Sequence, residues 1–205
     1  ALLALEGEAL SPAERSTRLK DLARQFAGTD TANQALESAA ALDSGVAEER
    51  GAAEAYAALR TGAIDALSAL ADPSSEALRP GEALGRVCAS EIPVELVDDA
   101  AFRKARGDLI DALIARIPVI AREAAGLADE AEARGDYQET IAPLAAALAR
   151  CELNEGTETL LAAEKRPGFE EAREEIAGLT ARLQGLEGRE AEFAAVRQQR
   201  ERAMV

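Results

Sequence analysis

Alanine occupies 49 of the 205 positions and leucine another 25, which limits the folds open to this chain. Alanine is the strongest helix former, because its side chain loses no rotamer freedom in a helix. β-Branched residues, which favour strands, are scarce. At 48%, the hydrophobic content is too high for a disordered chain, even with a net charge of −15. We therefore expect an all-α protein, either stacked antiparallel helical hairpins or an antiparallel helix bundle.

Charge and aromatic content restrict the partners of the chain. The sequence has 38 acidic and 23 basic residues, and its basic residues form no cluster large enough to track a phosphate backbone. With no tryptophan, two tyrosines and four phenylalanines, it also lacks platforms for stacking nucleic-acid bases. No apolar run reaches the ~18 residues that span a bilayer. We expect a neutral or basic protein or peptide partner, no nucleic acid and no transmembrane segment; the oligomeric state stays open.

Histidine is absent from the sequence, which removes the commonest general base and the commonest metal ligand. A Ser-His-Asp triad and a Cys-His pair therefore cannot form. The two cysteines are too far apart in sequence for a Cys-x-x-Cys centre, and no glycine-rich nucleotide loop is present. We expect no catalytic residues, no metal site and no cofactor, so the chain is predicted not to be an enzyme.

Cys88 and Cys151 allow two interpretations. They can form one disulfide in an oxidising compartment, or they can be two small buried thiols. The sequence begins with the apolar run Ala1–Leu5, which suits a processed precursor and a trimmed chain equally well. Cytoplasmic and periplasmic or secreted locations are therefore equally open.

Turn residues divide the chain into three parts: helical hairpins over 1–72, an irregular connector with short helical pieces over 73–100, and a repeat-like helical region over 101–205. The three parts can also belong to one continuous domain. In the first part, Ser11-Pro12-Ala13-Glu14 predicts a capped helix start. Asp43-Ser44-Gly45 is predicted to end one helix before a longer helix over 46–70.

The third part carries one long apolar face with helical spacing. Pro118 lies inside this run, so we expect a kink or break near 115–117. The face comprises Phe102, Ala105, Leu109, Leu113, Ile117, Ile120, Ala124, Leu127 and Ala131.

Residues 121–154 resemble one tetratricopeptide repeat. The matching positions are Leu127 and Ala128 in the first helix, Gly135 and Tyr137 in the turn, and Ala147 and Leu148 late in the second helix. The sequence departs from the pattern at Ala124, Thr140 and Glu152, where a large aromatic, alanine and proline are usual.

A second, weaker copy extends the resemblance to about 121–186. Phe169, Ala172, Ile176 and Leu179 follow Tyr137, Thr140, Leu144 and Ala147 at a constant offset. A weak match also covers 19–42, where the joint at Phe26–Thr29 is similar to that of bacterial lipoprotein-type tetratricopeptide proteins.

The tetratricopeptide resemblance implies a binding surface for peptides or partner proteins, with no catalysis of its own. We therefore expect a non-enzymatic interaction module or scaffold built from helical hairpins. The alternative is a ligand-sensing helical bundle that forms the extracytoplasmic part of a larger protein. The sequence does not assign the binding face in either case.

Overall fold

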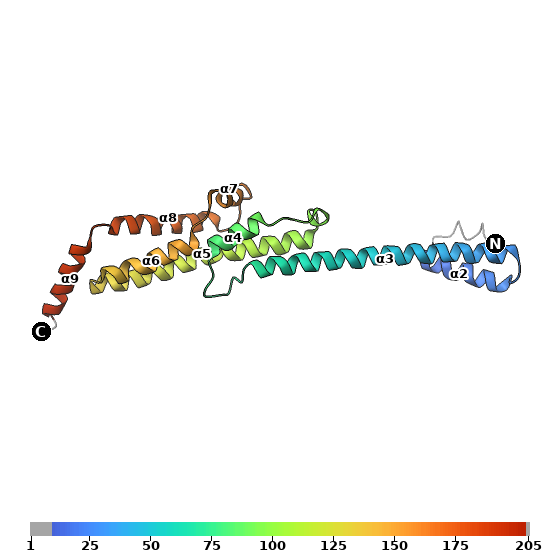
Figure 1. Ribbon diagram of the computed structural model, residues 1–205, viewed down its shortest axis with the longest axis horizontal. Coiled ribbons are helices and arrows are strands. Elements are labelled where there is room, and N and C mark those ends of the chain that lie inside the picture. Colours follow the sequence, from blue (N-terminus) through green and yellow to red (C-terminus); the bar gives the residue numbers. More distant parts are fainter. Residues whose placement is uncertain (1–9, 204–205) are drawn as a thin grey trace. The chain divides into compact units, whose positions relative to one another are not determined.

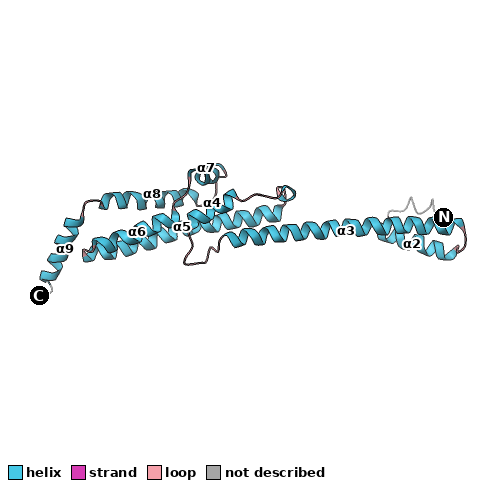
Figure 2. Cartoon of the chain, in the orientation of Figure 1, coloured by secondary structure: helices cyan, strands magenta, loops and turns pink. Residues whose placement is uncertain are grey.

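The computed structural model describes residues 10–203, and within this range every regular element is a helix (Figures 1 and 2), which confirms the all-α prediction. The elements are α2 (Pro12–Gln25), α3 (Asp30–Leu70), α4 (Pro80–Ala89), the 3-10 helix η1 (Val94–Leu96), α5 (Ala100–Arg134), α6 (Tyr137–Cys151), α7 (Glu155–Ala163), α8 (Phe169–Leu186) and α9 (Glu190–Ala203). Contacts divide the chain into a first unit that ends at Thr61 and a second unit that starts at Gly62. Helix α3 therefore contributes residues to both units. The stretch 73–100 belongs to the second unit and contains α4 and η1.

The first unit is a hairpin of α2 and the start of α3. As predicted, Ser11 and Glu14 form a capping box at the start of α2, and Pro12 occupies the first turn. Gly28 adopts a left-handed φ of 86° in the turn that follows. The buried apolar residues of this hairpin are Leu19, Ala23, Ala32, Ala35 and Ala39. Most are alanines, so the two helices pack through small side chains.

The predicted helix end at Asp43-Ser44-Gly45 is wrong, because α3 continues through all three residues. The Asp43 carboxylate accepts hydrogen bonds from Ser16 Oγ and Lys20 Nζ, both at 2.6 Å, and so bonds to α2. The hydrogen bond from Lys20, and to a lesser degree the one from Ser16, lowers the pKa of Asp43. Gly45 has no positive φ. Asp43, one of the three residues that suggested a stop, thus joins α2 to α3.

In the second unit, α5 and α6 form a hairpin, and α8 packs against both (Figure 1). Helix α4 also packs against α5 and α6, and it contacts α7. Large apolar side chains from all five helices are fully buried, among them Leu84, Ile110, Leu113, Ile117, Leu144, Leu161 and Leu186. These helices therefore enclose one continuous apolar core.

Helix α5 runs from Ala100 to Arg134 with Pro118 inside it, so of the predicted kink or break near 115–117 the break does not occur. Pro118 is buried, as are Ile117 and Ile120 on either side of it. Packing on both sides of the proline holds the chain helical, although the proline has no backbone donor. Asp99 caps the start of α5 by accepting a 2.7 Å hydrogen bond from the Phe102 backbone N–H.

Candidate functional site

The turn between α5 and α6 carries two of the six tetratricopeptide-like positions. Gly135 ends α5 in the left-handed conformation at φ 77°. Asp136 caps α6 by accepting a 3.0 Å hydrogen bond from the Glu139 backbone N–H, and Tyr137 is the first residue of α6. A Cβ added to Gly135 would lie 2.8 Å from the backbone nitrogen of Arg197. Helix α9 therefore approaches this turn as closely as a glycine allows.

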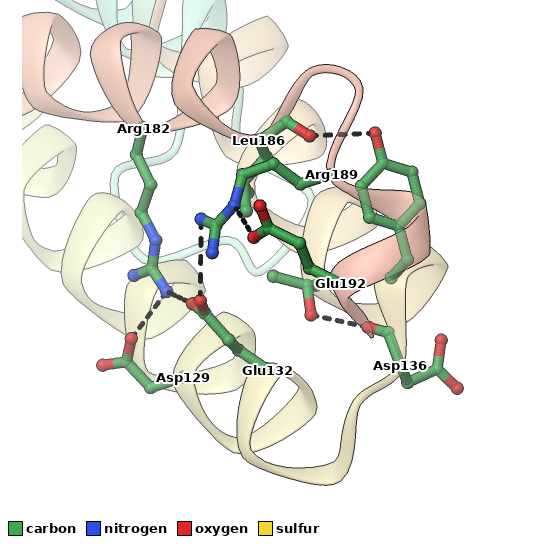
Figure 3. A network of polar contacts seen from close by, with 9 residues as sticks. Asp129, Glu132, Asp136, Arg182, Leu186, Arg189 and Glu192 are labelled. Atoms are coloured by element: carbon green, nitrogen blue, oxygen red, sulfur yellow. Dashed lines mark hydrogen bonds and ion pairs between the residues drawn. The ribbon is translucent and has the colours of Figure 1, made fainter. Parts of the chain in front are cut away.

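Tyr137 links the turn to α8 and α9. Its hydroxyl donates a 3.1 Å hydrogen bond to the carbonyl oxygen of Leu186 (Figure 3). Its ring meets the Phe193 ring edge to face, with centroids 5.3 Å apart and an interplanar angle of 74°. The guanidinium of Arg189 lies over the Phe193 ring, 5.8 Å from its centroid. Tyr137 thus joins the start of α6 to the corner between α8 and α9.

Figure 3 also shows an ion-pair cluster that ties α5 to α8. Arg182 of α8 contacts Asp129 at 2.6 Å and Glu132 at 3.3 Å. Glu132 lies 3.9 Å from Arg189, which pairs with Glu192 at 2.7 Å. Each of these carboxylates is matched by an arginine, and among residues 10–203 no group of three potential ligands could hold a metal ion. The acidic residues at the end of α5 therefore hold α5 to α8 through ion pairs with arginines.

The other four repeat-like positions differ in burial. Ala128 and Ala147 are buried, and Leu148 is half-buried. Leu127 is 58% exposed, so its place on the predicted apolar face is wrong. It lies at the edge of the buried side of α5, whereas Ala124, Ala128 and Ala131 face the core. Leu127 is therefore an exposed leucine on α5 that does not belong to the core.

The two predicted repeat copies share a burial pattern. At the start of α6, Thr140, Leu144 and Ala147 are buried behind a half-buried Tyr137. At the start of α8, Phe169, Ala172 and Leu179 are buried, and Ile176 is half-buried. The weak match at 19–42 falls on the α2–α3 hairpin. These positions pack helices against one another.

Cys88 and Cys151 are both free thiols in the structure. A Cβ on Gly81 would lie 2.9 Å from the backbone carbon of Cys151, so the start of α4 is what approaches Cys151. Cys88 lies about two helical turns beyond Gly81 on α4, and the two sulfurs are not bonded to each other. Burial raises the pKa of both thiols, and that of Cys151 to about 11.

We expect two titratable thiols per chain after denaturation without reductant, and very slow labelling of Cys151 in the native protein. Only the thiolate reacts, and burial keeps Cys151 protonated until pH approaches about 11. Between about pH 9 and 11 the unfolded chain releases this proton while the native protein retains it, so stability falls as pH rises. Counting thiols with a chromogenic disulfide tests this, and fewer than two in the denatured chain would indicate the disulfide.

An apolar groove of about 250 Å³ lies between the end of α3, the segment after α4 and the start of α5. We call it the connector groove. Its lining residues are Ala63, Ala66, Leu67, Leu70, Ser90, Glu91, Pro93 and Phe102. Leu67 and Phe102 are anchored in the core at 5% and 2% exposure, so the floor of the groove is fixed by packing.

The segment beside the connector groove exposes three aliphatic side chains. Ile92 is 37% exposed, Val97 49% and Val94 80%. Leu96 between them is fully buried and holds the segment to the core. Sequence patterns did not predict this exposed apolar surface, because residues 73–100 show no helical periodicity. Its only trace in the sequence is a short run of aliphatic residues that alternate with acidic ones.

The chain segments that form the walls of the connector groove are acidic. Residues 62–72 and 89–101 contain six acids and no base: Asp65, Asp72, Glu91, Glu95, Asp98 and Asp99. All but Asp99 are exposed. Arg103 follows on α5, and its guanidinium donates to the Asp98 carbonyl oxygen at 3.1 Å. The start of α5, which also borders the groove, carries the bases Arg103, Lys104 and Arg106, so the acidic character comes from the other two segments.

A larger open hollow of about 460 Å³ lies where α6 meets α9. Its lining includes the charged or polar residues Asp136, Gln138, Glu190 and Arg197 beside Tyr137. The connector groove differs from it in having a mainly apolar lining.

None of the helices within residues 10–203 combines the length and the apolar character that a membrane span requires.

Comparison of the chain with family models, with curated proteins and with solved structures finds no match.

Proposed function

We propose that the chain is a non-enzymatic module for binding a protein or peptide, and that it docks its partner in the connector groove. The observation that carries this proposal is an anchored apolar groove with three exposed aliphatic side chains at its side, of which Val94 is 80% exposed. Exposed apolar patches on a protein surface often mark interaction sites. Burying such side chains in a complex supplies the central apolar contacts of an interface.

The groove has the features that a docking site requires. Its floor residues Leu67 and Phe102 belong to the core, so little ordering is needed before a partner binds. Its exposed residues can gain roughly 1 kcal/mol or more each when a partner covers them. The tetratricopeptide resemblance points the same way, because that family binds peptides and partner proteins. The sequence, which has no histidine, offers few groups for catalysis.

Photo-crosslinking from the groove tests this function. With p-benzoylphenylalanine at position 94, the intact chain is expected to give a discrete protein adduct in the cells that produce it. The same probe at position 127, an exposed leucine site on α5, is expected to give none. Because capture alone is weak support, the adduct should also disappear when Ile92→Ser is combined with the probe at 94. Identical adducts from both positions, or no adduct from position 94, would argue against docking in the groove.

A further inference from the structure

We infer that the partner of the connector groove is a cationic amphipathic peptide segment. In this arrangement one apolar side chain of the segment enters the groove, and its lysines or arginines lie over the acidic surroundings. The inference rests on the proposed function and specifies the chemistry of the partner.

The size of the groove favours a single side chain over a small-molecule ligand. Its volume of about 250 Å³ is below the ~300–1,000 Å³ typical of small-molecule sites. Its lining is mainly alanine, leucine, proline and phenylalanine, with Ser90 and Glu91 as the polar members. One aliphatic or aromatic anchor fills such a space without leaving polar groups unpaired.

The exposed side chains beside the groove explain why the partner should be amphipathic. Ile92, Val94 and Val97 present apolar surface outside the groove itself. A helix or turn with apolar residues on one face can cover these three side chains while its anchor enters the groove. The opposite face of such a segment stays in water and is polar.

Charge complementarity predicts which charge the polar residues of the partner segment carry. The two segments that form the walls carry six carboxylates, and the start of α5 beside them carries Arg103, Lys104 and Arg106. Lys104 pairs with Asp108, and Arg106 donates hydrogen bonds to the carbonyl oxygens of Val87 and Cys88. A cationic segment is attracted to this surface, whereas an acidic one is repelled. Because the carboxylates are mostly exposed, the attraction is screened over a Debye length of ~8 Å at physiological salt. Binding should therefore weaken as salt increases.

Three synthetic peptides of equal length test the inference on the intact chain. They share one amphipathic pattern of leucines and carry lysine, glutamine or glutamate at every polar position. By fluorescence anisotropy at low salt, we expect the lysine peptide to bind at least about 10-fold more tightly than the glutamine peptide, and the glutamate peptide not to bind. A 10-fold difference corresponds to about 1.4 kcal/mol.

Matched variants locate the binding. The double change Ile92→Ser and Val94→Ser should weaken the lysine peptide by about 10-fold or more, because it removes exposed apolar contacts without opening the core. The double change Glu91→Gln and Asp98→Asn should weaken it and reduce its salt dependence. Leu127→Ser also removes an exposed aliphatic side chain, but from α5 away from the groove residues, and should leave the affinity unchanged.

The outcomes separate this inference from the proposed function. If the glutamine peptide binds as tightly as the lysine peptide and both depend on Ile92 and Val94, the cationic partner is wrong and groove docking stands. If the lysine peptide binds all groove variants equally, its attraction is non-specific and the inference fails. If no peptide binds while position 94 still gives its adduct, the partner chemistry is wrong. The absence of both peptide binding and adduct would overturn both proposals.

Discussion

Replacing Gly135 with alanine is expected to destabilise the second unit by about 3 kcal/mol. The left-handed φ of 77° costs a non-glycine residue roughly 1–2 kcal/mol. The new Cβ would also lie 2.8 Å from Arg197 N and 2.9 Å from Phe193 O, and such overpacking costs about 1–3 kcal/mol. Urea unfolding followed by circular dichroism measures the combined effect.

Two other glycines separate the causes of this destabilisation. Gly188 has nearly the same φ, 76°, but its Cβ would meet nothing within 4 Å, so Gly188→Ala should cost only about 1–2 kcal/mol. Gly126 lies inside α5 with open space around it, and Gly126→Ala should stabilise by about 0.5–1 kcal/mol. Equal losses for Gly135→Ala and Gly188→Ala would show that close approach of α9 does not matter.

Detachment of α9 would relieve the steric clash in Gly135→Ala. Because the obstructing atoms belong to α9, the variant can relieve overpacking by releasing that helix. Amide hydrogen exchange in residues 190–203 should then be faster in Gly135→Ala than in Gly188→Ala. Unchanged exchange together with a small stability loss would contradict the packing of α9 on this turn.

Replacing Leu144 with alanine is expected to cost about 3 kcal/mol. Leu144 of α6 is fully buried in the core of the second unit. Truncation of a buried leucine loses its transfer free energy and leaves a cavity, for a total of about 2–5 kcal/mol.

Leu127→Ala is the matched control for Leu144→Ala, because it is the same substitution at a leucine that is 58% exposed. It should change stability by less than about 0.5 kcal/mol. Urea unfolding of the two variants measures the difference. Similar losses at the two positions would mean that Leu127 packs into the core as Leu144 does.

Local sequence signals predicted the helices well wherever the deciding contacts are local. The capping box at Ser11 and Glu14 depends on residues three positions apart, and it forms as expected. Apolar periodicity likewise identified most of the buried face of α5, although Ala105 and Leu109 are half-buried and Leu127 is exposed. The all-α architecture itself was predicted from the high alanine and leucine content.

Predictions failed where distant residues decide the outcome. Asp43 was expected to end a helix, but it bonds to Ser16 and Lys20, more than 20 residues away along the chain. Pro118 was expected to kink or break the helix, but α5 is not broken, and residues on both sides of the proline are buried in the core formed with other helices. Neither competing contact can be read from the local pattern.

The connector groove was not predictable from the sequence, because three separate segments build it. Residues near 63–70, 90–93 and Phe102 meet only when α3, α4 and α5 pack together. The sequence places Ile92, Val94 and Val97 in an irregular connector and does not indicate that they are exposed. Leu96, which lies among them, is fully buried. The repeat-like residues, which the sequence did single out, lie away from this groove.

The central claim is that the partner binds at the connector groove, and the most direct test is the dissociation constant of the protein captured from position 94. Titration calorimetry should be run with the wild-type chain, the Ile92→Ser and Val94→Ser double variant, and Leu127→Ser. We predict that the double variant loses at least about 10-fold in affinity and that Leu127→Ser binds like the wild type. Equal affinity for the wild type and the double variant would contradict the claim.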